Sequence, residues 1–273
     1  MNTFIDTSRL MNNGYTTDEE FKLSNKSGSM CNTTVLFNNT KQEHGLFISR
    51  INPYDISSHM LLSSIEETII HSNVKYNLGA HRMHYGYNYS GTRYISSADN
   101  GVIPSIVYNT GAFELKKEIL LSVENNFLVL KYSLSNSIHP VLMKIKPFLA
   151  FRNIKALSKS TSEITVPYAH INNGFKSKLY PNYPYLYIQS SIKPELLDNP
   201  EWYYNFKYKA TTIETNPSED LYVPCSLKII LDTDDSFILS VGLKEQDTET
   251  LNLLFEKEKI KLLSHACMKP YYE

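Results

Sequence analysis

Aromatic side chains between residues 180 and 208 are the first groups of this sequence that could bind a ligand. The stretch reads YPNYPYLYIQSSIKPELLDNPEWYYNFKY and contains nine aromatic residues, including the only tryptophan. Tyrosine and tryptophan combine an apolar ring with a polar edge, which suits a hydrated surface that binds a partly apolar ligand. Sugars are such ligands, because their C–H faces stack on aromatic rings while their hydroxyl groups need hydrogen-bond partners. The candidate carbohydrate-binding aromatics are Trp202, Tyr203, Tyr185 and Tyr187. The alternative for each is burial in a core, where most large aromatic side chains lie.

Carboxylates are the next groups to consider, because most glycosidases use two of them as acid and as base or nucleophile. The doublets Glu66-Glu67 and Glu219-Asp220 are the obvious candidates. Adjacent residues of a strand point to opposite faces of the sheet, so neither doublet can act as a pair if it is extended. We expect one member of each doublet to pair with an arginine and the other to be solvated.

The remaining polar candidates are few. Arginine is scarce relative to lysine, and its planar guanidinium could clamp sugar hydroxyl groups. Arg82 or Arg152, with Glu67, is expected to fix sugar hydroxyls. Arg152 follows the apolar run FLAF, which favours a structural ion pair instead. His44 precedes a glycine at the start of an apolar run, where a role in a turn or a hydrogen bond is the alternative to binding.

Metal and cofactor motifs are missing from the sequence. His81 and His84 have a spacing typical of ligands on a helix, but they lie in a glycine- and tyrosine-rich segment without a third ligand nearby. Nucleophile-elbow, phosphate-loop and dinucleotide fingerprints are absent. We therefore expect no catalytic residue, no metal and no cofactor.

The elements that must position these residues are mostly strands. From Asn32 onward, apolar runs of four to eight residues recur between Asn, Gly, Ser and Pro, and more than ten such strands follow with almost no helix between them. Without crossover helices the sheets must be mainly antiparallel. A hairpin is expected around Asn109-Thr-Gly, and an exposed loop with at most one short strand over residues 79–103.

One helix is expected near the end of the chain. From Asp247 onward a stripe of apolar residues has helical spacing, formed by Leu251, Leu254, Phe255 and Leu262. The predicted fold is all-β: a large antiparallel two-sheet β-sandwich with a C-terminal helix. Its expected parts are an N-terminal extension (1–30), the β-sandwich domain (31–246) and a linker-like helix and tail (247–273).

Charge and composition exclude several classes of partner. The 27 basic and 28 acidic residues are balanced, so neither nucleic acid nor an anionic membrane surface is expected as a partner. No run approaches the ~20 apolar residues of a membrane span, and the first residues do not resemble a secretory signal. Three widely spaced cysteines indicate free thiols in a reducing compartment, so a cytoplasmic location is expected.

Several stretches, taken in order, resemble the N-terminal domain of bacterial and archaeal-type glycogen debranching enzymes (amylo-α-1,6-glucosidases). They span roughly residues 20 to 260 and read LSNKSGSMCNTTVLFNNTKQEHGLFIS, HMLLSSIEETII, KPFLAFRNIKALS, YPYLYIQ, NPEWYYNFKY and EDLYVPC. The resemblance implies a galactose mutarotase-like supersandwich placed before an (α/α)-barrel that holds the catalytic carboxylates. It also implies that this chain alone has no debranching activity.

The sequence departs from the family pattern at two glycine- or arginine-rich motifs. The family's Asn-Thr-Arg-Arg-Tyr-His-Gly-Leu-Leu reads NTKQEHGLF over residues 39–47, without either arginine. The family's Asn-Gly-x-Gly-Gly reads NKSGS over residues 25–29. If those residues serve the interface with the barrel, the chain is a diverged stand-alone relative or pairs differently.

Three functions follow as hypotheses. The leading one is a non-catalytic domain of a debranching-type glycoside hydrolase that binds or positions α-glucan, as glycogen or maltooligosaccharide. Its expected protein partner is a helical-barrel hydrolase domain or a second copy of the chain. The alternatives are an aldose epimerase-like sugar enzyme with a histidine and a glutamate in a cleft, for which fold analogy is the warrant, and a purely structural docking domain.

Overall fold

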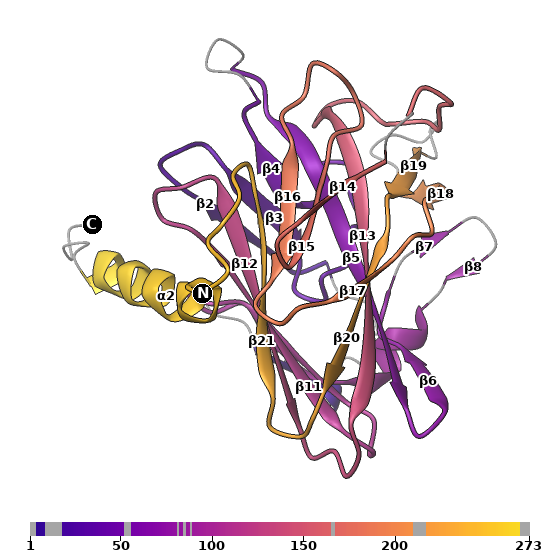
Figure 1. The fold of residues 1–273 in the computed structure, drawn as a ribbon, viewed down its shortest axis with the longest axis vertical. Helices are drawn as coiled ribbons and strands as arrows, with labels where there is room; N and C mark the ends of the chain where they lie inside the picture. Colours follow the sequence, from indigo (N-terminus) through magenta and orange to yellow (C-terminus); the bar gives the residue numbers. More distant parts are fainter. Residues whose placement is uncertain are drawn as a thin grey trace.

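The structure is a computed structural model that describes residues 4–8, 18–51, 56–80, 82–83, 86–87, 89–164, 167–209 and 217–267. In this part of the chain, two large antiparallel sheets pack face to face and one long helix lies beside them (Figure 1). The predicted β-sandwich with a C-terminal helix is therefore confirmed.

The first sheet has nine strands. Their order is β1 (Phe4–Asp6), β9 (Ile95–Asp99), β10 (Ser105–Asn109), β11 (Glu114–Leu121), β12 (Phe127–Ser135), β21 (Ser236–Gly242), β16 (Leu186–Ser190), β15 (Gly174–Ser177) and β14 (Ala169–Ile171). The predicted hairpin joins β10 to β11, and Gly111 in its turn has a φ of 81°, a conformation that glycine adopts without strain.

The second sheet has ten strands. Its main path is β17 (Glu195–Leu197), β20 (Ser226–Leu231), β13 (Val141–Asn153), β5 (His59–His71), β4 (Gly45–Ser49), β3 (Met30–Thr34) and β2 (Glu20–Ser24). Off this path, β6 (Val74–Asn77) pairs with β5, and β19 (Ser218–Val223) pairs with β13 and with β18 (Glu201–Lys207). Strands β5 and β13 have 13 residues each and form the centre of the sheet. A separate ribbon pairs β7 (Arg82–Met83) with β8 (Gly86–Tyr87).

The main core lies between the sheets and follows from alternation along the strands. In β12, Leu128, Leu130 and Tyr132 enter this core, while Phe127 and Val129 point to the opposite face. In β13, Val141, Met143 and Ile145 alternate along the strand and are all buried between the sheets. Because the side-chain period of a strand is two, each inward set also fixes which residues face outward.

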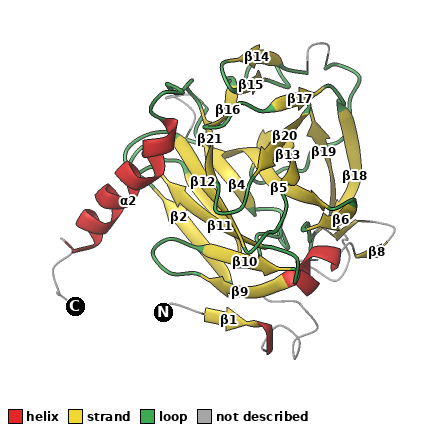
Figure 2. Cartoon of the chain, turned by 60° about the horizontal axis from the view of Figure 1, so that its bottom comes forward, coloured by secondary structure: helices red, strands yellow, loops and turns green. Residues whose placement is uncertain are grey.

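Helix α2 (Leu251–Cys267) covers part of the outer face of the nine-stranded sheet, beside β12 and β21 (Figure 2). Its predicted apolar stripe packs on that face: Leu251 and Phe255 are buried, and Leu254 and Leu262 are half-buried. The buried carboxylate of Glu258 accepts hydrogen bonds from Ser122 Oγ (2.9 Å) and from the backbone N–H of Val123 (3.1 Å). None of the helices in the described ranges has the length and apolar character needed to cross a bilayer.

The segment 79–103 differs from its prediction as an exposed loop with at most one short strand. It contains β7, β8, a 3₁₀ helix (Tyr89–Tyr94) and strand β9, whose Ile95 and Ala98 are buried. Gly91 serves close packing of the backbone, because a Cβ atom on it would lie 2.1 Å from the carbonyl oxygen of Leu78. At this position glycine marks two backbones in contact and not a solvent-exposed loop.

Candidate functional site

A tyrosine-lined pocket lies at the β14–β16 edge of the nine-stranded sheet. Its volume is about 250 Å³, and its lining residues are Glu163, Ile164, Tyr168, Ala169, Lys176, Lys178, Leu179, Tyr180, Pro181 and Tyr185. Three phenol groups, two ammonium groups and one carboxylate therefore converge on one small volume. This mixture of ring faces and hydrogen-bonding groups is typical of a small-molecule site.

One of the predicted aromatics, Tyr185, lines this pocket, and a second, Tyr187 on strand β16, lies next to it. Leu186 and Ile188 point into the core, so Tyr187 faces outward, and Tyr185, which just precedes the strand, is 41% exposed. The two tyrosine rings lie 6.5 Å apart at 66°. The alternation along YLYIQ leaves both rings on the outer face.

Two lysines stand beside these rings. Lys176 lies opposite Tyr187 in the β15–β16 register, and its Nζ is 5.0 Å from the Tyr185 ring centroid and 5.9 Å from that of Tyr187. Lys178 Nζ lies 4.8 Å from the Tyr185 centroid. The attraction between ammonium groups and ring faces at such distances keeps the lysine heads at the pocket.

The other wall of the pocket is built by a turn. The backbone N–H of Tyr183 donates to the carbonyl of Tyr180 (3.1 Å), and Pro181 occupies the second position of this turn, which its fixed φ favours. Burial, followed by the nearby charge of Glu163, raises the pKa of Tyr180. Burial likewise raises the pKa of Tyr168. Both phenol groups are therefore protonated at neutral pH. Tyr180 can donate a hydrogen bond to a ligand, whereas Tyr168 OH donates to Asp198 Oδ1 (3.4 Å) and offers its oxygen as an acceptor.

Trp202 and Tyr203 do not lie at this pocket, because β18 belongs to the other sheet. The Trp202 ring packs against the core between the sheets and lies 5.0 Å from the ring of Tyr222. Tyr203 packs on the outer face, 5.1 Å and edge-on from Phe148, and its hydroxyl lies 2.6 Å from Lys146 Nζ. The four predicted aromatics are thus divided between two surfaces.

Glu67 lies in the core between the sheets and bridges them. Its Oε1 accepts hydrogen bonds from Lys117 Nζ (2.7 Å) on β11 and from Tyr132 OH (2.6 Å) on β12. Burial, followed by the charge of Glu67, raises the pKa of Tyr132 well above its ordinary value. Lys117 Nζ also lies 4.7 Å from the Phe37 ring centroid. Because Glu67 is only 2% exposed, this carboxylate holds the sandwich together and does not reach the surface.

Glu66 points to the opposite face, as the spacing of the doublet predicts. It is buried on the outer face of the ten-stranded sheet, with Lys146 Nζ 3.9 Å from its Oε1. The expectation that one member of this doublet pairs with an arginine and the other is solvated is wrong. Both glutamates are buried, and both have lysine partners.

The protonation of Glu66 gives a pH-dependent prediction. Burial raises the pKa of this carboxyl above its ordinary value, and the charge of Lys146 offsets the effect only in part. The folded protein therefore binds the proton of Glu66 more tightly than the unfolded chain does. The stability that this proton contributes is lost as pH rises through the folded pKa. We expect Glu66→Gln to match the wild type near pH ~4 and to be more stable near pH ~7.5, measured by urea unfolding at both values. A less stable variant near pH ~7.5 would show that the ion pair with Lys146 outweighs the cost of burial.

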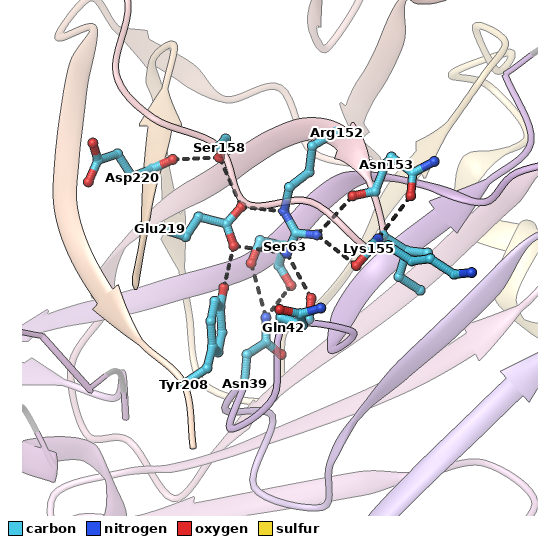
Figure 3. Close-up of polar contacts among 11 residues, drawn as sticks. Asn39, Gln42, Ser63, Arg152, Asn153, Lys155, Ser158, Tyr208, Glu219 and Asp220 are labelled. Atoms are coloured by element: carbon cyan, nitrogen blue, oxygen red, sulfur yellow. Dashed lines mark hydrogen bonds and ion pairs between the residues drawn. The ribbon is translucent and has the colours of Figure 1, made fainter. Parts of the chain in front are cut away.

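Arg152 forms a buried network with Glu219 (Figure 3). Its Nε and Nη2 contact the two carboxylate oxygens at 2.5 and 2.9 Å, and Nη2 also donates to the carbonyl of Gln42 (2.7 Å). Ser158 Oγ and Tyr208 OH donate to the same carboxylate at 2.9 and 2.6 Å. The structural ion pair predicted for Arg152 is confirmed, and this side chain is 5% exposed.

The second member of that doublet, Asp220, is not solvated as expected. It is buried, and its carboxylate accepts hydrogen bonds from the backbone N–H groups of Ser160 (3.1 Å) and Asn205 (3.0 Å). Ser158 Oγ, which donates to Glu219, also lies 2.8 Å from the backbone carbonyl oxygen of Asp220 and so connects this residue to the Arg152 network.

His44 is also fully buried. Its Nδ1 accepts a hydrogen bond from the backbone N–H of Thr40 (3.1 Å), and its Nε2 lies 3.2 Å from Glu20 Oε1 without the alignment of a hydrogen bond. Burial lowers the pKa of this imidazole, so it is neutral at neutral pH. This is the hydrogen-bonding role in a turn that was the alternative to ligand binding.

Two remaining candidates lie partly or wholly outside the described residues. Arg82 belongs to β7, which lies beside β18, but its side chain is outside the described part. His81 and His84 fall outside it entirely. Among the residues described, no group of three or more His, Cys, Asp or Glu side chains is placed to hold a metal ion. Cys31 and Cys225, the two cysteines whose side chains the structure describes, are free and buried.

Sequence reasoning missed Lys176, Lys178, Tyr168 and Tyr180 as residues of the site. A signal for the lysines exists in GFKSKLY, where Lys176 and Lys178 alternate with the buried Phe175 and Ser177. Tyr180 belongs to the aromatic stretch 180–208, although it was not among the four candidates chosen from it. No local signal identifies Tyr168, because the contact between its segment and Tyr180 depends on how β14, β15 and the following turn pack.

A family model described as glycogen debranching enzyme N terminal matches residues 19–238. Among known structures, a bacterial glucoamylase complexed with acarbose is similar over 91% of this chain and 37% of its own, with 12% identity and a TM-score of 0.41. A heparinase III is similar over 57% of this chain and 22% of its own, with 12% identity and a TM-score of 0.29. The chain thus spans well under half the length of these proteins. No curated protein sequence matches it.

Proposed function

Because the chain belongs to the glycogen debranching enzyme N-terminal family, we propose that it binds or positions α-glucan for a debranching-type glycoside hydrolase. The ligand would be glycogen or a maltooligosaccharide, and the catalytic groups would belong to a separate helical-barrel domain or chain. The observation that carries this proposal is the pocket that Tyr168, Tyr180 and Tyr185 line at the edge of the nine-stranded sheet.

The volume of the pocket suits one sugar unit and not a longer segment of glucan. Its volume of about 250 Å³ is below the roughly 300–1,000 Å³ of sites that enclose a drug-sized ligand. An end or branch glucose would enter the pocket, where the phenol groups and Glu163 offer partners for its hydroxyls. The following units would lie across Tyr185, which is exposed, and Tyr187, which is half-buried on the outer face.

The carboxylates support a binding role over a catalytic one. Hydrolysis of a glycosidic bond needs two carboxyl groups that flank it, and Glu163 is the one carboxylate among the lining residues. Glu67 and Glu219 are both committed to buried ion pairs. No histidine lines the pocket, so the epimerase alternative gains no support from it.

Removing the exposed rings tests the proposal. We expect Tyr185→Ala combined with Tyr187→Ala to weaken binding of maltopentaose about tenfold, because each ring contact contributes ~0.5–1.5 kcal/mol by analogy with aromatic pairs. Isothermal titration calorimetry measures the change. Tyr204→Ala is the matched control, since Tyr204 is 56% exposed but lies on β18 of the other sheet.

Two results would contradict the proposal. Unchanged affinity in the double variant would exclude this pocket as the binding site. No heat of binding from the wild type with maltopentaose or glycogen at millimolar glucose units would remove the binding function itself.

A further inference from the structure

The pocket carries more positive charge than a neutral sugar needs. Lys176 and Lys178 both line it, and among the described residues neither forms an ion pair with a carboxylate. Some lysines elsewhere in the structure do form such pairs: Lys41, Lys116, Lys117, Lys131, Lys228 and Lys261 each lie within 3.0 Å of a glutamate oxygen. The two pocket lysines therefore keep their full charge for a ligand.

From this arrangement we infer that the preferred ligand is an α-glucan that carries a phosphate monoester, an inference that rests on the proposed function. Residues 176 and 178 are two apart in an extended segment, so their side chains project from the same face. Both ammonium groups lie beside the Tyr185 ring, where a stacked sugar would sit. Lysine binds phosphate as a point charge, and a ring face holds the ammonium group without neutralising it.

The charge of the ligand follows from the charges of the pocket. A phosphate monoester carries about −1.5 to −2 at pH 7, whereas a carboxylate carries a single charge. Two ammonium groups on one side of the pocket match the phosphate better. Glu163 also lines the pocket and lies close enough to Tyr180 for its charge to contribute to the raised pKa of that phenol. The sugar hydroxyls would face Glu163 and Tyr180, and the phosphate would face Lys176 and Lys178.

The experiment compares four ligands by titration calorimetry: maltopentaose, maltopentaose with one phosphate monoester, maltopentaose with a terminal glucuronate, and inorganic phosphate. We expect the phosphorylated oligosaccharide to bind at least about tenfold more tightly than the neutral one. This preference should shrink as salt rises from about 20 to about 300 mM, because salt screens the charges. Lys176→Gln with Lys178→Gln should abolish the preference. The control Lys75→Gln with Lys144→Gln, on β6 and β13 of the other sheet, should retain it.

Each outcome separates this inference from the proposed function. Equal affinity for neutral and phosphorylated maltopentaose would overturn the phosphate preference and leave glucan binding in place. Binding of neither would remove both. If maltopentaose with a glucuronate binds as tightly as maltopentaose with a phosphate monoester, the match to the phosphate charge is overturned. If inorganic phosphate binds as tightly as the phosphorylated oligosaccharide, the lysines form an anion site that does not recognise the sugar, which also overturns the inference. If the lysine variant does not fold, a preference that stays constant with salt in the wild type contradicts the inference.

Discussion

Replacing Lys117 with methionine should lower the free energy of unfolding by about 3–5 kcal/mol, because the change leaves Glu67 as an uncompensated charge inside the sandwich. Both side chains are almost fully buried, and the two residues come from different sheets. Tyr132 would still donate a hydrogen bond to Glu67 Oε1. One neutral donor does not replace an ammonium group, so the carboxylate would be ionised at high cost or protonated. Urea unfolding at neutral pH measures the loss.

Lys116→Met is the matched control for this prediction. Lys116 precedes Lys117 on β11 but points outward, and it pairs with Glu118 at 2.8 Å on the surface. Exposed pairs contribute ~0–1 kcal/mol, so the control should unfold near the wild-type midpoint. Adding Glu67→Leu to Lys117→Met should recover part of the lost stability, because it removes the stranded charge. Equal midpoints for Lys117→Met and Lys116→Met would show that the bridge between the sheets contributes little.

Replacing Glu219 with alanine should cost about 3–5 kcal/mol as well, because it leaves the Arg152 guanidinium buried without its carboxylate. Three donors lose their acceptor together, from the side chains of Arg152, Ser158 and Tyr208. Thermal and urea unfolding measure the effect. The position of the 40–44 turn should also change, because Arg152 Nη2 holds it through the carbonyl of Gln42.

Glu195→Ala provides the comparison for this second prediction. Glu195 also forms an ion pair, with Lys228 at 2.8 Å, but its side chain is 59% exposed. Its loss should cost less than ~1 kcal/mol. If Glu219→Ala and Glu195→Ala lower the free energy of unfolding equally, burial does not determine how much the Arg152 network contributes to stability.

The hydrogen bond from Arg152 to the carbonyl of Gln42 also explains how the chain keeps the Arg152–Glu219 network although residues 39–47 depart from the family motif. The resemblance places two arginines where this sequence has Lys41 and Gln42. Arg152 binds the backbone carbonyl of Gln42, which any residue supplies. Lys41 pairs with Glu20 at 2.6 Å on the surface. Loss of the two arginines therefore leaves the interior of this region intact and changes the charge outside it.

Much of the fold could be predicted because short-range patterns determine it. Alternation along YLYIQ and PVLMKIK gives the inward residues of β16 and β13, and helical spacing gives the face of α2 that packs on the sheet. A two-residue period and a 3.6-residue period are properties of neighbouring residues. They therefore need no knowledge of which strands pair.

Pairing between distant strands could not be predicted, and the site depends on it. Tyr187 and Trp202 are 15 residues apart in one aromatic stretch, yet β16 and β18 belong to different sheets. Glu67 meets Lys117, and Arg152 meets Glu219, across 50 and 67 residues. No local pattern encodes such partners. The sequence therefore offered Tyr185 and Tyr187 as candidate binding residues, with burial as the alternative, but did not indicate the pocket that Tyr185 lines.

The central claim is that α-glucan binds over Tyr185 and Tyr187, and ring-labelled tyrosine NMR tests it most directly. Resonances are assigned by single Tyr→Phe variants, and maltopentaose is then added to the wild type. The account predicts ring shifts that saturate with ligand for Tyr185 and Tyr187, while the exposed Tyr204 on β18 does not move. Saturating shifts at Tyr204 with none at Tyr185 or Tyr187 would place the glucan on the other sheet and contradict the account.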